Sequence, residues 1–119
     1  MNPSTPFRMV DERNDGDTVV FTVVVPEDCP FFAGHFPGRP VLPAIGQLAI
    51  LAAVLRRVTG PSVSLTGVDG FRLSRQVLPG DRIEVRLEEL RNSTAAFQIR
   101  CDGAPVSRGI LRVAAGRGA

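Results

Sequence analysis

The stretch that decides the fold is Val41–Val58, which reads VLPAIGQLAILAAVLRRV. Its length and composition are typical of an α-helix of four or five turns, with Pro43 tolerated in the first turn and Gly60–Pro61 as the end signal. Apolar side chains occupy every face, and only Gln47 interrupts them before two arginines. A helix that is apolar all round is buried all round, so we predict a buried central helix.

Strands are predicted on both sides of this helix. Residues 18–25, TVVFTVVV, are β-branched and apolar, as is typical of a strand. Turn signals after residue 61 separate four further predicted strands, at roughly 63–73, 81–91, 95–102 and 107–113. We expect residues 1–17 and 114–119 to be loose. From its length, we predict that the whole of 1–119 is a single domain.

The loop before the helix, residues 26–40, reads PEDCPFFAGHFPGRP and is too rich in proline and glycine for regular structure. It contains the only histidine, His35. A lone histidine is more often structural than catalytic. Here, however, a proline-fixed loop with Phe36 and Gly38 holds the imidazole beside an apolar helix, and imidazole exchanges protons near neutral pH. The helix start near Ala44 adds unpaired backbone N–H groups that can polarise a carbonyl oxygen.

The order of these elements predicts an α+β fold in which a strongly curved antiparallel sheet wraps around one long helix. A sheet of five or six strands covers one side of such a helix and leaves its other flank bare. A two-fold partner that adds its own sheet edge to edge would close that gap. We therefore expect a homodimer or a higher assembly of dimers.

Composition excludes several other classes of protein. A chain with 44% hydrophobic and 22% charged residues is globular rather than disordered. Its fourteen cationic residues are all arginine and are scattered, which argues against nucleic acid; an acidic protein or a phosphate suits them at least as well. The longest apolar run is far shorter than the ~20 residues of a membrane span. Cys29 and Cys101 lack metal-ligand spacing, so we expect reduced thiols in the cytoplasm.

The motif GHFPGRPVLP, residues 34–43, resembles the active site of the 3-hydroxyacyl-acyl-carrier-protein dehydratases of bacterial lipid synthesis, the FabZ/FabA group. Residues 25–48 are most similar to the branch associated with aryl-polyene and polyketide pathways, and the likeness extends over about 18–113. The resemblance implies a hotdog fold and an acyl-thioester substrate, carried by acyl carrier protein or coenzyme A. It also implies fatty-acid or polyketide metabolism without a metal or an organic cofactor.

The same resemblance implies residue roles. His35 falls on the histidine that removes a proton from C2 of the acyl chain, and Phe36 and Gly38 belong to its motif. Ala44 falls where a backbone N–H holds the thioester carbonyl. The family's helix acid, which protonates the departing C3 hydroxyl across the dimer, falls on Ala49. A methyl group cannot donate a proton.

Three interpretations of a pocket without that acid stay open. Dehydration can persist, with the acid's part taken by His35, by ordered water, or by Gln47 positioning that water. The pocket can instead perform other thioester work, as a thioesterase or an isomerase. It can also be a non-catalytic acyl-binding subunit, or the partner of an active one. We take a dehydratase of 3-hydroxyacyl thioesters as the leading prediction.

Other polar residues have a functional and a plainer interpretation. Glu27 and Asp28 could reach the pocket or lie in a solvated turn, and Asp69 fits a turn or bulge. Cys29 could pair with His35 or be a small buried thiol. Gln47 either satisfies a buried backbone group or lines the pocket. Arg39 fits a phosphopantetheine phosphate or an exposed loop charge equally well.

Overall fold

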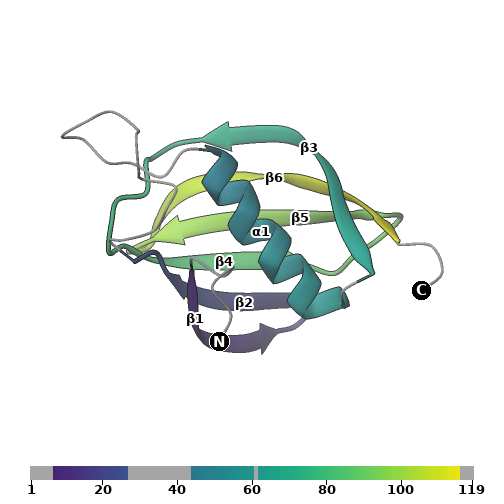
Figure 1. Cartoon of the computed structure of the whole chain (residues 1–119), viewed down its shortest axis with the longest axis horizontal. Coiled ribbons are helices and arrows are strands. Elements are labelled where there is room, and N and C mark those ends of the chain that lie inside the picture. The colour runs from purple at the N-terminus through teal and green to yellow at the C-terminus, as the bar shows by residue number, and fades with distance from the viewer. Residues whose placement is uncertain (1–6, 27–43, 61, 116–119) are drawn as a thin grey trace.

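The computed structural model describes residues 7–26, 44–60 and 62–115. Within them, one antiparallel sheet curves around a single helix, α1 (Ala44–Thr59), as Figure 1 shows. This confirms the predicted α+β hotdog architecture. The sheet order is β1-β2-β4-β5-β6-β3, with β1 at Arg8–Asp15, β2 at Thr18–Val24, β3 at Val63–Leu73, β4 at Arg82–Glu88, β5 at Thr94–Cys101 and β6 at Ala104–Ala115.

The turn signals in the sequence correspond to real turns. The β4–β5 hairpin turns at Asn92 and Ser93, whose φ angles are 51° and 64°. The β5–β6 hairpin turns at Asp102 and Gly103, with φ of 53° and 79°. Paired left-handed residues give a two-residue turn whose twist matches that of the flanking strands, which explains why short Asn- and Asp-led signals end these strands.

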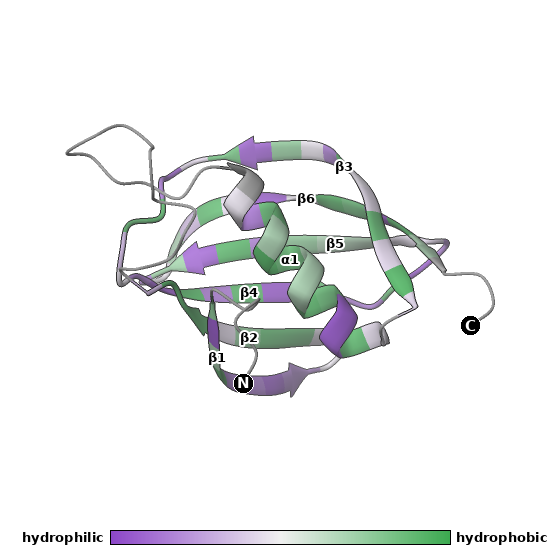
Figure 2. Cartoon of the chain, viewed as in Figure 1, coloured by the Kyte–Doolittle hydropathy of each residue, from purple (hydrophilic) through white to green (hydrophobic). Residues whose placement is uncertain are grey.

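The N-terminal segment differs from the prediction. Residues 1–17 are predicted to be loose, yet 8–15 form strand β1, which pairs along its length with β2. None of its eight side chains is buried, and seven of the eight are exposed. Figure 2 shows β1 as almost wholly hydrophilic beside the hydrophobic β2. A strand without a buried face carries no alternation, so its sequence resembles that of a loop.

Ion pairs on the outer face attach β1 to the sheet. Arg13 lies 3.3 Å from Glu84, and Arg86 lies 3.3 Å from Asp15 and 3.4 Å from Glu84. Val20 lies in register between Arg13 and Arg86 and is fully buried although it is outside the main core. Aliphatic arginine stems can cover an apolar neighbour in this way while their heads stay in water.

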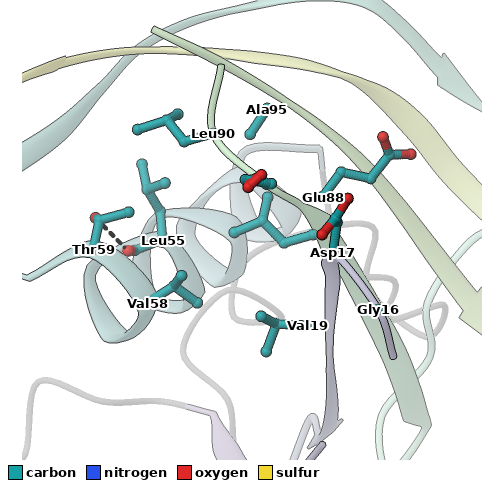
Figure 3. A pocket seen from close by; sticks show the side chains of 11 residues that line it. Gly16, Asp17, Val19, Leu55, Val58, Thr59, Glu88, Leu90 and Ala95 are labelled. Carbon is teal, nitrogen blue, oxygen red and sulfur yellow. Dashed lines mark hydrogen bonds between the residues drawn. The ribbon is translucent and has the colours of Figure 1, made fainter. Parts of the chain in front are cut away.

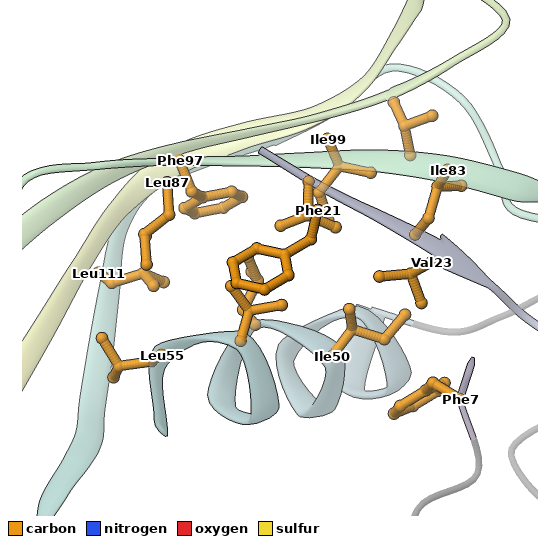
Figure 4. Close-up of a cluster of buried hydrophobic side chains, with 14 of the residues drawn as sticks. Phe7, Phe21, Val23, Ile50, Leu55, Ile83, Leu87, Phe97, Ile99 and Leu111 are labelled. Carbon is orange, nitrogen blue, oxygen red and sulfur yellow. The ribbon is translucent and has the colours of Figure 1, made fainter. Parts of the chain in front are cut away.

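The core lies between the sheet and one face of α1 (Figure 4). Alternate residues of β2, β4 and β5 point toward the helix, as the burial of every second side chain in β4 and β5 shows. The helix contributes Ile50, Leu51, Val54 and Leu55, all essentially inaccessible to water. The core is aliphatic with a few phenylalanines, since the sequence has no tryptophan or tyrosine.

Helix α1 is less enclosed than the sequence predicts. Of the expected range 41–58, residues 41–43 lie outside the described part of the chain, and the helix continues to Thr59. One face is buried, but Ala49, Ala52 and Ala53 on the other flank are partly exposed. Burial all round is therefore wrong for a single chain, because one sheet covers one side of a helix. The flank that its own sheet does not cover is partly exposed.

Candidate functional site

The predicted site residues divide into two groups. His35, Phe36 and Gly38 lie outside the described residues, as do Glu27, Asp28, Cys29 and Arg39. Ala44, Gln47 and Ala49 lie on α1 and can be placed. Ala44 is the first residue of the helix, so its N–H is among the four that have no partner within the helix.

Gln47 lies in the first turn of α1 and is completely buried against the sheet. The hydroxyl of Ser107 on β6, itself 1% exposed, donates a hydrogen bond of 2.7 Å to Oε1 of Gln47. Ser107 had no signal in the sequence, because an isolated serine in a strand looks like any other surface residue. Its buried position depends on a register that only the fold reveals.

The amide nitrogen of Gln47 is a buried hydrogen-bond donor that is not satisfied. Among the described residues, Nε2 has no hydrogen-bond partner although it is buried. A buried donor without a partner costs roughly 1–3 kcal/mol, so native proteins keep few of them. The structure does not support the interpretation in which Gln47 satisfies a backbone group of the described chain. It leaves a donor available in the first turn of the helix.

Two residues beyond Ser107 on β6, a glycine lets an aromatic ring pack against the strand. Gly109 follows Ser107 on the same face of the strand, and a Cβ at Gly109 would lie 3.0 Å from the ring of Phe97. That ring stacks on Phe71 of the edge strand β3, with centroids 6.3 Å apart.

Ala49, where the resemblance puts the missing acid, lies on a different side of the helix from Gln47. Two residues along an α-helix turn the side chain by about 200°, so the two point in nearly opposite directions. Burial agrees, because Gln47 is fully buried and Ala49 is partly exposed. The amide of Gln47 therefore cannot occupy the place of a carboxyl at position 49.

Asp69 has the structural role that the sequence favours. The pairing of β3 with β6 is irregular between Asp69 and Arg72, and Gly70 has a φ of 61°. The carboxylate of Asp69 pairs with Arg112 across the strands at 3.0 Å. Both side chains are more than half exposed, so this ion pair contributes little stability.

Charge is distributed unequally between the two ends of the sheet. At the end of the sheet where β2, β3 and β5 end, none of six described arginines forms an ion pair with a described residue: Arg8, Arg72, Arg75, Arg82, Arg100 and Arg108. Arg72 and Arg108 are direct cross-strand partners, an arrangement that is destabilising unless an anion approaches. Asp81 and Asp102 lie at the same end, close to Cys101, and offset part of this positive charge.

A pocket of about 280 Å³ lies at the opposite end of α1 (Figure 3). Its apolar wall includes Leu55, Val58 and Leu90, and the carboxylates of Glu88 and Glu89 lie among the lining residues with Asp17. Carboxylates repel a phosphate-bearing thioester, so this pocket does not suit the predicted substrate. The sequence did not single it out.

Cys101 is a buried free thiol on the inner face of β5. Burial, together with the nearby charges of Asp81 and Asp102, raises its pKa above the ordinary value of 9.0. A thiol that resists ionisation is a poor nucleophile, so Cys101 contributes to packing rather than to chemistry.

No described helix is long and apolar enough to cross a membrane.

A six-stranded antiparallel sheet that curves around one long helix is the hotdog fold. The ApeI-like family model, described as ApeI dehydratase, matches residues 11–110. The chain therefore belongs to the ApeI-like dehydratase family.

Individual relatives agree with this assignment. The chain is 39% identical to a 3-hydroxyacyl-[acyl-carrier-protein] dehydratase FabZ of Herpetosiphon aurantiacus, over 92% of this chain and 87% of the relative. It is 37% identical to the FabZ of Myxococcus xanthus, over 87% and 78%. Among solved structures, the dehydratase heterocomplex ApeI:P of Xenorhabdus doucetiae shares the fold with a TM-score of 0.79 at 16% identity, covering 89% of this chain and 96% of that chain.

Proposed function

We propose that the protein converts 3-hydroxyacyl thioesters into trans-2-enoyl thioesters, with His35 as the base. The observation that carries this proposal is the family match over residues 11–110, which spans the His35 loop and all of α1. The names of the FabZ relatives support the same reaction. The start of α1 at Ala44, directly after that loop, supports a substrate carbonyl at the N-terminus of the helix.

The proposed reaction removes one molecule of water. His35 takes the proton from C2, the electron pair left at C2 forms the double bond to C3, and the bond from C3 to the hydroxyl oxygen breaks. The leaving hydroxide needs a proton, which comes back from the His35 imidazolium directly or through ordered water, because Ala49 has none to give. Loss of one of two proton-transfer groups lowers the rate by roughly 10²–10⁴-fold. We therefore expect slow turnover.

We further propose that the thioester arrives on an acidic carrier protein rather than on coenzyme A. The arginines at the end of the sheet where β2, β3 and β5 end support this, in particular the neighbours Arg72 and Arg108. Complementary charge accelerates docking of an acidic partner and orients it. Arg39, in the His35 loop, would add positive charge to the same docking surface.

The active form is proposed to be a cytoplasmic homodimer. The partly exposed flank of Ala49, Ala52 and Ala53 supports it, since a second copy would cover the side of α1 that its own sheet leaves bare. Edge strand β3 is the favoured contact, because the other edge, β1, carries charges that discourage pairing.

A second candidate function is a partner subunit whose acid is supplied by a different chain. The absence of an acid at Ala49 favours it, and the ApeI:P dehydratase of Xenorhabdus doucetiae, which shares the fold, is a heterocomplex. In that case the chain alone would bind acyl thioesters and turn them over only with its partner present.

Mass spectrometry of the acyl carrier tests the leading proposal. The purified chain is incubated with a 3-hydroxyacyl carrier-protein thioester, and a product lighter by one water is expected, above the amount formed by a His35→Ala control. Release of the free acid instead would mean thioesterase activity. Equal product from both proteins would remove the enzyme interpretation.

A further inference from the structure

The two buried polar side chains in the described part of the chain, Gln47 and Ser107, contact each other. Because the Ser107 hydroxyl donates to Oε1, the carboxamide is held in one orientation, and Nε2 with its two hydrogens points away from that bond. Nε2 has no partner among the described residues. The pair thus fixes a buried donor that the described fold does not use.

A purely structural role does not account for this arrangement. The surrounding core is apolar, and two apolar side chains of the same shape would fill the space without leaving an unsatisfied donor. Buried unsatisfied groups in native proteins call for a specific explanation, such as a ligand. The position in the first turn of α1, within one turn of the unpaired N–H of Ala44, points to a ligand oxygen at that place.

We propose that Gln47 is a substrate-binding residue whose Nε2 donates a hydrogen bond to the carbonyl oxygen of the bound acyl thioester, and that Ser107 is the positioning residue that orients it. The assignment rests on the proposed thioester site. The carbonyl, and not the 3-hydroxyl, is the acceptor, because Gln47 lies about 200° around the helix from Ala49, where the family's hydroxyl-protonating acid would lie. Negative charge that builds on this oxygen during proton removal would meet two donors instead of one.

The test compares Gln47→Met, Ser107→Ala and the double variant with the wild type and with Gln76→Met, which alters an exposed glutamine. The probe is an acyl-pantetheine amide, which keeps the carbonyl oxygen but resists hydrolysis, labelled with ¹³C at that carbonyl. Its dissociation constant, the ¹³C shift of the bound carbonyl and the thermal midpoint of each protein are measured.

We expect the double variant to unfold at or above the wild-type temperature, since it removes a buried donor and its partner together. It should nevertheless bind the amide roughly 10-fold or more weakly, because one hydrogen bond to the carbonyl is lost. The bound ¹³C signal should move toward its value in water. Ser107→Ala should weaken binding less than Gln47→Met, and Gln76→Met should match the wild type.

The opposite pattern overturns the inference. A double variant that loses thermal stability but binds the amide with unchanged affinity and carbonyl shift would make the pair structural. Failure of the wild type itself to bind the amide would also overturn it. Wild type that binds the amide through Gln47 but forms no enoyl product would instead remove the dehydratase proposal and leave this inference standing.

Discussion

At the scale of single residues, the pH dependence of stability at alkaline pH can be assigned to Cys101. The sequence has no tyrosine, and all fourteen of its cationic residues are arginine. Arginine does not titrate in proteins, so the side chains that ionise between about pH 8 and pH 11 are the two cysteines. Burial raises the pKa of the Cys101 thiol above 9.0, whereas the same thiol in the unfolded chain ionises at its ordinary value.

The sign of the pH effect follows from this shift. Above the unfolded pKa the unfolded chain loses the Cys101 proton while the native chain keeps it, so alkaline pH favours unfolding. We expect the free energy of unfolding, from urea titrations, to be constant below about pH 8 and to fall as the pH rises past about 9. In Cys101→Ala the alkaline decline should largely disappear, whereas Cys29→Ala serves as the control. An unchanged decline in Cys101→Ala would contradict the assignment.

The sequence predicted part of the site at this scale. It singled out Gln47 because one polar residue in an apolar helix breaks the pattern, and Ala49 because a motif fixed its position. It missed Ser107, whose burial depends on contacts with β3 and α1, which are distant from it in the chain. His35 stays a prediction, because the described residues do not include its loop.

At the scale of elements, the two β-hairpins reach the same turn geometry with different residues. Asn92–Ser93 and Asp102–Gly103 both turn with positive φ, but Ser93 carries a Cβ that makes this conformation unfavourable. In the second hairpin Gly103 adopts it freely, and a Cβ there would meet nothing within 4 Å. The difference between the turns is therefore one of backbone preference alone.

Exchanging these residues should have effects of opposite sign. Ser93→Gly is expected to stabilise the protein by about 0.5–1 kcal/mol, because it removes the left-handed strain. Gly103→Ala is expected to destabilise it by about 1 kcal/mol, since it introduces the same strain. Midpoints of chemical unfolding measure both. Changes of the same sign in the two variants would show that the turns are not governed by φ.

Elements also show where sequence patterns succeed. Strand β3 and the end of α1 were predicted almost to the residue, and β4 lies within the strand predicted at 81–91. Strand β1 was missed because its attachment depends on β2 and on ion pairs such as Arg13–Glu84, not on a buried face. Burial of α1 was overestimated, since an apolar pattern does not say which neighbour covers each flank.

At the scale of the whole molecule, charge separates one end of the sheet from the other. If the basic end docks a carrier protein, Arg72→Gln/Arg108→Gln should raise KM for the carrier-protein thioester roughly 10-fold with kcat nearly unchanged. The effect should shrink as salt rises, because exposed charges are screened. The same variant should leave KM for a short pantetheine thioester unaltered.

Two arginines at the far end of the molecule provide the matched control. Arg56→Gln/Arg91→Gln removes the same net charge from exposed positions near the C-terminal half of α1 and the β4–β5 turn. Steady-state kinetics with both substrates should match the wild type. An equal rise in KM for both double variants would show that net charge, rather than a docking surface, governs the carrier.

The central claim is that this chain keeps a dehydratase pocket from which one proton donor has been lost. Restoring a carboxyl with Ala49→Glu tests it, and Ala52→Glu, on the same partly exposed flank, is the control. The account predicts that Ala49→Glu forms enoyl thioester about 10²-fold faster than the wild type, while Ala52→Glu does not. An Ala49→Glu protein that folds, dimerises and binds acyl thioester but dehydrates no faster than the wild type would contradict it.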